Sequence, residues 1–114
     1  MNTLGELERS VMDILWTTPG TLSAYDIQAI LADRALAATT VLTVLSRLEN
    51  KGFVERSRDA RPHRYQAVAT REKHTADLMH EVLGGASDRA AVLERFVGQV
   101  SPAEADTLRR LLGR

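Results

Sequence analysis

Ala38-Thr-Thr-Val-Leu-Thr-Val-Leu-Ser-Arg-Leu48 is followed by Lys51-Gly52 and then by two short runs, Phe53-Val-Glu-Arg-Ser-Arg58 and His63-Arg-Tyr-Gln-Ala-Val68. This stretch decides the fold. In its first run apolar residues recur at spacings of three and four, which predicts one buried face of a helix. Lys51-Gly52 should end this helix, because a cation suits the negative helix end and glycine readily takes a left-handed conformation. The two later runs are strand-like and predict a β-hairpin.

Two more helices are expected before this stretch. The first has an apolar stripe and ends at Trp16, which lies on the apolar side and is expected in the core. Ser23 can cap a second helix by accepting a hydrogen bond from the backbone N–H of Asp26. For the third helix, Thr39 or Thr40 is the expected cap. Three helices and then a hairpin is the order of a winged helix-turn-helix.

From Thr70 onward the helical period returns in three short segments, separated by Gly84-Gly85 and Ser101-Pro102. The expected fold class is therefore mainly α with a small β-hairpin: a winged helix-turn-helix over residues 1–69 and a helical segment over residues 70–114. Helices of about ten residues are not stable alone, so their stripes need a partner, which a second copy of the chain would supply. The alternative is that these helices fold back on the winged domain and make a larger monomer. The expected dimer-interface residues are Met79, Val82, Val92, Leu93, Phe96, Val97, Leu108, Leu111 and Leu112.

Composition excludes several classes of protein. A chain of 114 residues with 44% hydrophobic residues fits one compact domain with a small appendage. It has no cysteine, so thiolate metal sites, disulfides and cysteine nucleophiles are all excluded, and we expect no metal and no cofactor. The N-terminus lacks the basic start of a signal peptide, and no apolar run is long enough to span a bilayer. We expect a cytoplasmic protein without membrane insertion.

The charges are unevenly distributed in a chain whose formal net charge is zero. Residues 34–64 hold seven Lys and Arg against three acids, a net charge of +4, so the remainder carries −4. A basic stretch that coincides with the predicted third helix and wing is typical of a protein that binds the backbone of duplex DNA. The alternative is that a surface helix and hairpin of any protein carry arginines.

The third helix also presents side chains suited to a major groove. Hydroxyls can meet bases or phosphates, threonine methyls can meet the thymine methyl, and arginine can bind guanine. Each threonine alone could equally be a helix cap or solvated surface. The expected reading residues are Thr39, Thr40, Thr43, Ser46 and Arg47. The expected phosphate contacts from the wing are Arg56, Arg58, Arg61, His63 and Arg64.

These segments resemble a known family. Glu6-Leu-Glu-Arg-Ser-Val-Met-Asp-Ile-Leu-Trp16, the run from Ala38 to Leu48, Lys51-Gly-Phe-Val54 and Asp59-Ala-Arg-Pro-His-Arg-Tyr65 are similar to the penicillinase and methicillin-resistance repressors (BlaI/MecI), above all to their actinobacterial branch. The resemblance implies a homodimeric repressor of antibiotic-resistance genes on a palindromic operator. It also implies inactivation by a membrane-bound sensor protease, which cuts the C-terminal part.

The chain departs from this family in two places. Staphylococcal members are cleaved between asparagine and phenylalanine, whereas the nearest counterpart here is Arg95-Phe96, our candidate for the proteolytic site. The copper-responsive branch carries a C-terminal cysteine motif, which a chain without cysteine cannot use. The sequence therefore leaves open which protease, if any, acts on this protein.

Other functions were weighed against the residues present. An enzyme is not expected, because His74 and His80 lie on different faces of one helix and His80-Glu81 is not followed by the second histidine of a zinc protease. Two alternatives stay open: a MarR- or ArsR-type repressor that responds directly to a ligand, and a winged helix that binds another protein. For Trp16, the alternative to a place in the core is stacking on DNA.

Overall fold

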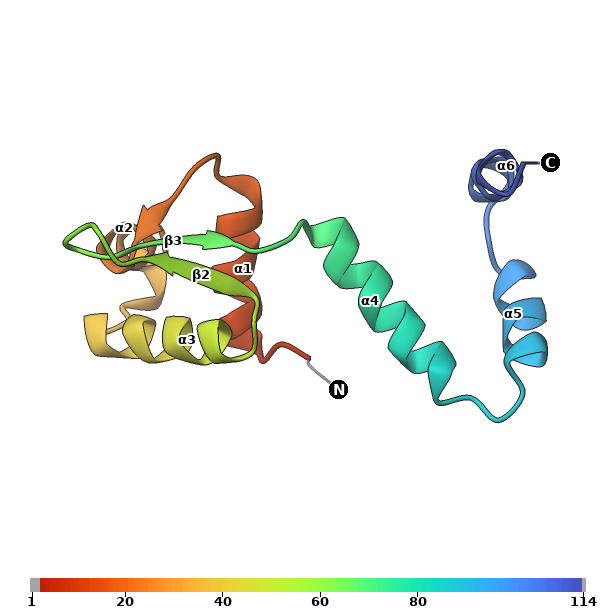
Figure 1. Ribbon diagram of the computed structural model, residues 1–114, viewed down its shortest axis with the longest axis horizontal. Helices are drawn as coiled ribbons and strands as arrows, with labels where there is room; N and C mark the ends of the chain where they lie inside the picture. Colours follow the sequence, from red (N-terminus) through yellow and green to blue (C-terminus); the bar gives the residue numbers. More distant parts are fainter. Residues whose placement is uncertain (1–2, 114) are drawn as a thin grey trace. The chain divides into compact units, whose positions relative to one another are not determined.

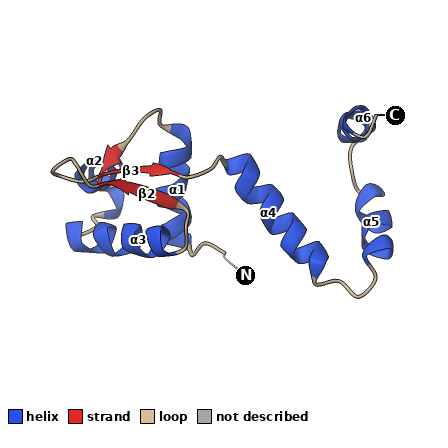
Figure 2. Cartoon of the chain, in the orientation of Figure 1, coloured by secondary structure: helices blue, strands red, loops and turns tan. Residues whose placement is uncertain are grey.

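The computed structural model describes residues 3–113. Helices and the strands of a small sheet come first along the chain, and three further helices follow (Figures 1 and 2). The elements are α1 (Glu6–Thr17), β1 (Leu22–Ser23), α2 (Ala24–Ile30), the short 3-10 helix η1 (Ala32–Arg34), α3 (Ala38–Asn50), β2 (Val54–Ser57), β3 (Arg64–Ala67), α4 (Arg71–Gly84), α5 (Arg89–Val97) and α6 (Pro102–Leu111). The expected mainly α fold class is confirmed.

The chain forms two compact units, one ending at Leu78 and the other beginning at Met79. The first, here called the winged unit, contains α1 to β3 and also the first half of α4. Our sequence analysis assigned that half to the helical segment beginning at residue 70. The second, here called the C-terminal unit, contains the end of α4 with α5 and α6.

The N-cap observed for α2 is the one predicted from the sequence, whereas the N-cap of α3 is not. The Ser23 hydroxyl accepts from the Asp26 N–H at 3.1 Å, and the Asp26 carboxylate accepts from the Ser23 N–H at 2.9 Å, so the expected cap is confirmed. At α3 the expected threonine cap is wrong, because the N-cap is Ala37 and no side chain caps the helix. Thr39 and Thr40 lie inside the first turn, where their own hydroxyls cannot cap it.

The end of α3 follows the prediction from Lys51-Gly52. Gly52 has φ +83°, the left-handed conformation that glycine takes most easily. The Phe53 N–H donates to the Leu48 carbonyl at 2.9 Å and the Gly52 N–H donates to the Glu49 carbonyl at 3.0 Å, which satisfies two carbonyls at the helix end.

The sheet has three strands in the order β1-β3-β2, whereas the sequence predicted a two-stranded hairpin. β2 and β3 pair antiparallel with Arg56 opposite Tyr65, and β1 adds Leu22 opposite Tyr65 on the other edge. A strand of two residues is too short to show alternation, so β1 could not be recognised from its own sequence. Both hairpin strands are also one residue shorter at each end than predicted.

The hydrophobic core lies entirely within the winged unit. Its buried members come from α1, α2, α3 and the sheet: Val11, Met12, Leu15, Ala24, Ile27, Val41, Val44, Leu45, Leu48, Val54 and Tyr65. The apolar face predicted for the third helix is therefore confirmed as its buried face. Neither α5 nor α6 has a buried residue. The winged unit holds α3 and the hairpin on a packed core, and the described residues of the C-terminal unit, 79–113, form no such core within one chain.

Candidate nucleic-acid interface

The outward face of α3 is continuous and polar. Thr39, Thr40, Thr43, Ser46 and Arg47 are all exposed, opposite the buried apolar face of the same helix. The helical period places all five on one side, so a single surface can meet a groove. The geometry therefore brings the predicted reading residues together.

Two further residues of this face were missed from the sequence. Leu42 is 44% exposed and lies one helical step from Thr39 and Ser46, and Asn50 is exposed at the end of the same face. The three-and-four spacing that joined the threonines also includes Leu42. An exposed leucine among hydroxyls adds an apolar contact of the kind that a thymine methyl accepts.

The hydroxyls of this face differ in what they can still donate. The Thr43 hydroxyl donates to the Thr39 carbonyl at 2.9 Å, so its oxygen remains free to accept a hydrogen bond. No side chain caps α3, and the Thr40 N–H already donates to the Ala37 carbonyl at 3.1 Å. Within residues 3–113, the N–H groups of Ala38 and Thr39 therefore remain available at the positive end of the helix.

The Lys51 ammonium group binds a carboxylate of the protein and so holds the end of α3 in place. Its Nζ lies 2.9 Å from both carboxylate oxygens of Glu8 on α1, and Glu8 is buried. The Gly5 N–H donates to the same carboxylate at 2.8 Å. The Gly5 hydrogen bond, and then Lys51 beside it, hold the pKa of Glu8 below its ordinary value against the opposing effect of burial. This ion pair fixes the end of α3 against the start of α1.

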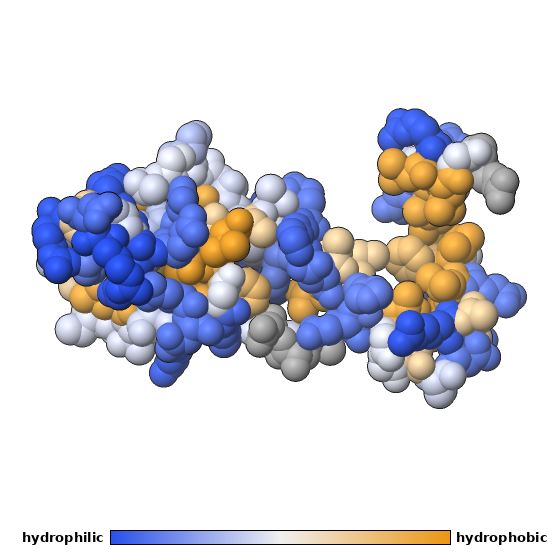
Figure 3. Space-filling model, in the orientation of Figure 1, coloured by the Kyte–Doolittle hydropathy of each residue, from blue (hydrophilic) through white to orange (hydrophobic). Residues whose placement is uncertain are grey.

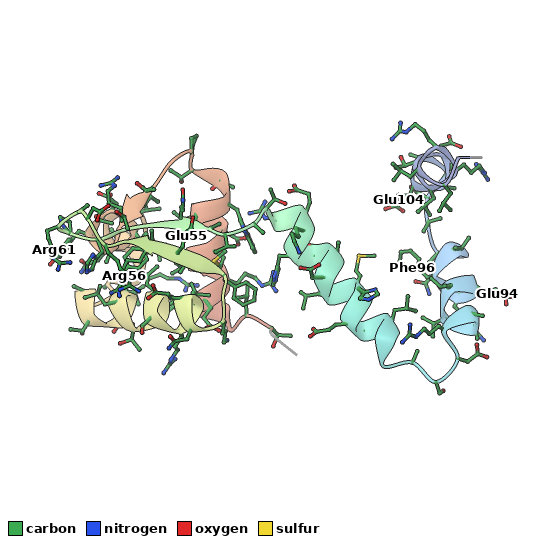
Figure 4. All side chains as sticks on the ribbon, viewed as in Figure 1. Glu55, Arg56, Arg61, Glu94, Phe96 and Glu104 are labelled. Carbon is green, nitrogen blue, oxygen red and sulfur yellow. The ribbon has the colours of Figure 1, made fainter. Side chains whose placement is uncertain are left out.

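Arg56 lies on the inner side of the wing. Alternation along β2 puts it on the same face as buried Val54, so its guanidinium reaches back toward α3. Its Nε is 3.7 Å from Glu49 Oε2, and only 28% of the side chain is exposed (Figure 4). Arg58 Nη2 lies 3.8 Å from the same oxygen but is 71% exposed. Glu49, which the sequence analysis did not single out, therefore joins the reading helix to the wing.

The remaining wing cations divide into held and free. Arg64 donates from Nε and Nη2 to the hydroxyl and carbonyl of Thr21, each at 2.8 Å, and so is tied to the segment before β1. Arg61 is exposed at the wing tip between β2 and β3 (Figure 4), where it contacts the His63 ring. Arg64 forms an ion pair with Asp26. Of the lysines and arginines on α3 and the wing, Arg47 and Arg61 have no carboxylate partner within residues 3–113.

Asp26 links the α2 cap to the wing. Hydrogen bonds from the Ser23 N–H and hydroxyl, and then the nearby charge of Arg64, lower the pKa of the Asp26 carboxyl. The carboxylate form is therefore the one that holds Arg64 beside the cap, at 3.8 Å.

Trp16 packs at the edge of the core and not on the outward face of α3. It is partly buried, and its Nε1 donates to the Ala69 carbonyl at 3.1 Å. The His74 ring lies 5.3 Å from it, centroid to centroid, and the Arg71 guanidinium lies 5.4 Å from its ring. These contacts favour a place for Trp16 in the core over stacking on DNA. Its ring lies at the edge of the core and not in its centre.

The residues predicted for a dimer interface are largely exposed in the single chain. Figure 3 shows hydrophobic side chains gathered on α5 and α6. Phe96 is 43% exposed, Val97 55% and Leu112 75%, and Leu108 is half-buried. Ala91, Val92, Arg95, Phe96 and Gln99 line a shallow, open depression along α5. The Arg95–Phe96 bond lies in the exposed last turn of that helix.

The described part of the chain has neither a metal-binding cluster nor a membrane-spanning helix. Residues 3–113 contain no group of three or more His, Cys, Asp or Glu side chains that could hold a metal ion. None of the helices found there has the length and apolarity that crossing a bilayer requires.

The sequence model of the penicillinase repressor family matches residues 4–114. The chain belongs to the penicillinase repressor family. It is 48% identical to the transcriptional regulator BlaI of Mycobacterium tuberculosis, strains CDC 1551 and H37Rv, over 96% of this chain and 82% of the relative. A penicillinase repressor with these relatives is a DNA-binding transcriptional regulator and not an enzyme.

Solved structures show the same fold at low identity. A MarR family protein from Bacillus stearothermophilus matches with TM-score 0.52 and 19% identity, over 96% of this chain and 70% of that one. Streptococcus pneumoniae FabT in complex with DNA matches with TM-score 0.50 and 20% identity, over 96% and 71%. Both likenesses support the winged-helix fold of this penicillinase repressor.

Proposed function

We propose that this repressor binds a palindromic operator as a homodimer, with α3 in the major groove and the wing on the phosphate backbone. The regulated genes are those of β-lactam resistance or cell-envelope stress, and the protein acts in the cytoplasm. The observation that carries the proposal is the contrast between the two units: one presents a polar reading face on a complete core, and the other exposes its apolar residues.

The reading face supports DNA recognition by its chemistry. Thr39, Thr43 and Ser46 provide methyls and oxygens at helical spacing, and unpaired Arg47 lies beside them. Such groups discriminate base pairs in the major groove. Arg58 and Arg61 at the wing are exposed and suited to phosphates, which hold the protein in register without reading sequence. Arg56, Arg64 and His63 would serve the wing mainly by supporting its shape, since each already has a protein partner.

The exposed apolar side chains of the C-terminal unit support dimerisation. Exposed apolar side chains at Val92, Phe96, Val97 and Leu111 would be removed from water in a two-fold interface. A dimer presents two α3 helices to half-sites about one helical turn apart. Linking the two heads raises apparent affinity by roughly 10²–10⁴ because the second head binds intramolecularly.

The same unit supports release by proteolysis. A membrane-bound sensor protease that cuts Arg95–Phe96 would separate α6 and half of the apolar stripe from the winged unit without touching α3. The bond is in an exposed last helical turn, where local unfolding toward the extended form that proteases bind is least costly.

The test is a pair of full-length variants of α5. Phe96→Glu puts a charge on the apolar stripe, and Glu94→Ala changes a residue that leaves the helix on another side (Figure 4). By sedimentation, the first should be monomeric at micromolar concentration and should bind a palindromic operator roughly 10²–10⁴ times more weakly, with affinity for one half-site unchanged.

The Glu94→Ala control should sediment and bind as the wild type does. A wild-type chain that is monomeric, or a Phe96→Glu variant that binds the palindrome as tightly, would contradict the proposal. Cutting after Arg95 should reproduce the Phe96→Glu result.

A further inference from the structure

The start of α4 is fixed to the winged unit by a cluster of contacts that the reading face does not use. Its members are Trp16 at the end of α1, Phe53 before β2, and Ala69, Arg71 and His74 around the beginning of α4. All five belong to the winged unit. Trp16 and Phe53 also pack, partly buried, against the core of the winged unit, so the cluster joins the start of α4 to the edge of that core.

Two separate sets of contacts hold the start of α4 against the rest of the winged unit. The indole N–H of Trp16 donates to the Ala69 carbonyl at 3.1 Å, immediately before the helix begins. One turn into the helix, the His74 ring lies between two aromatic rings, 5.3 Å from Trp16 and 5.1 Å from Phe53. Contacts before the helix and along its first turns fix its direction as well as its position.

A third contact closes the outer side of the cluster. Arg71 Nη2 lies 3.0 Å from Asp13 Oδ1, and its guanidinium also lies over the Trp16 ring. His74 is only 9% exposed, and its Nε2 has no hydrogen-bond partner within residues 3–113. Burying an imidazole nitrogen without a partner costs stability, so the site is not optimised for stability alone.

We propose that Trp16, Arg71 and His74 form a latch that fixes the direction in which α4 leaves the winged unit and thereby sets the half-site spacing that the repressor accepts. The inference rests on the proposed homodimer. α4 runs without a break from Arg71 to Gly84, and its first half, as far as Leu78, belongs to the winged unit. A rigid connection restricts a dimer to few spacings, whereas a loose one accepts many.

The three residues act as positioning residues, because none of them lies on the outward face of α3. The matched full-length variants are His74→Ala, which removes the ring between Trp16 and Phe53, and His74→Phe, which keeps a ring and removes the unpartnered nitrogen. The probes are palindromes built from a half-site selected from random DNA, with the central spacing as selected, lengthened by about two base pairs, or lengthened by about five, half a helical turn.

Wild type should prefer the selected spacing by roughly tenfold or more. His74→Ala should bind the single half-site as wild type does but lose most of that preference, and His74→Phe should keep it. If His74→Ala fails to fold, Arg71→Ala replaces it, since that side chain is 46% exposed.

The outcomes separate the two proposals. A wild-type monomer, or equal affinity for one half-site and for the palindrome, overturns the homodimer. A wild-type dimer that has no spacing preference, or a His74→Ala dimer that retains it in full, overturns the latch alone. Equal weakening of the half-site and all palindromes also overturns it, because a merely structural role predicts that result.

Discussion

The two units of this protein both contain amphipathic helices but differ in how far they bury apolar side chains. The winged unit buries eleven apolar side chains among α1, α2, α3 and the sheet. In the C-terminal unit, α5 and α6 bury none, although α6 is as amphipathic as α1 and α3. A stripe of apolar residues therefore predicts that a helix face needs covering, and only the surrounding structure shows whether the same chain covers it.

The units also use their charges differently. In the winged unit most ion pairs connect distant segments, as Lys51 connects α3 to α1 and Glu49 connects α3 to the wing, and one, Lys73–Asp77, lies within α4. In the C-terminal unit, Arg109 and Asp106 pair within one helix turn. Ion pairs between elements fix their relative position, whereas exposed pairs within a helix contribute only about 0.3–0.5 kcal/mol.

The largest effect expected on folding comes from comparing one leucine of each unit. Leu45 is 0% exposed and Leu112 is 75% exposed. Leu45→Ala should lower the free energy of unfolding by about 2–5 kcal/mol, because it leaves a cavity in the core. At dilute concentration Leu112→Ala should change it by less than about 0.5 kcal/mol, as for other surface substitutions.

Chemical denaturation at two protein concentrations measures the free energy of unfolding of both variants. The Leu112→Ala effect should grow with concentration, as the dimer forms, and the Leu45→Ala effect should not. Equal losses in dilute solution would show that the C-terminal unit has a core within one chain, and the contrast between the units would fail.

The next effect distinguishes base reading from phosphate binding. Arg47→Ala or Thr43→Ala should cost about 1–3 kcal/mol at particular base pairs and alter sequence preference. Arg61→Ala should weaken binding to all sequences alike and reduce the salt slope by about one, because it removes one phosphate contact. Fluorescence anisotropy with specific and random duplexes, each over a range of salt concentrations, separates these results.

The C-terminal unit supplies the control for charge. Arg109→Ala removes a cation from α6, where it pairs with Asp106, and should leave both affinity and salt slope unchanged. If all these substitutions acted equally on specific and random DNA, the assignment of α3 to base reading would be wrong.

The smallest effect is a pH dependence in the winged unit. Glu8 has a pKa below its ordinary value of 4.5 when folded. Its contribution to stability is therefore fully present above pH 4.5 and is lost as the pH falls through the lower folded value. Glu8→Gln should flatten the acid limb of a stability curve measured by urea denaturation. Glu94→Gln, in the C-terminal unit, should follow the wild-type curve, and an unchanged acid limb in Glu8→Gln would refute the role of the ion pair.

Local features were predictable because their causes lie close together in the sequence. The Ser23 cap needs Asp26 three residues later, the end of α3 needs only Lys51-Gly52, and the buried face of α3 follows from its own period. The outward set from Thr39 to Arg47 follows from the same period. The sequence by itself therefore determined the helices, the hairpin and which side of α3 is free to read.

Only the tertiary structure decided which charged and aromatic groups are already engaged. Lys51 meets Glu8 across 43 residues, Arg64 meets Thr21 across 43, and Trp16 meets Ala69 across 53. No periodicity links such positions, because their proximity results from packing α1, α2, α3 and the sheet around one core. The same packing converts a uniform list of wing arginines into held residues, such as Arg64, and free ones, such as Arg61.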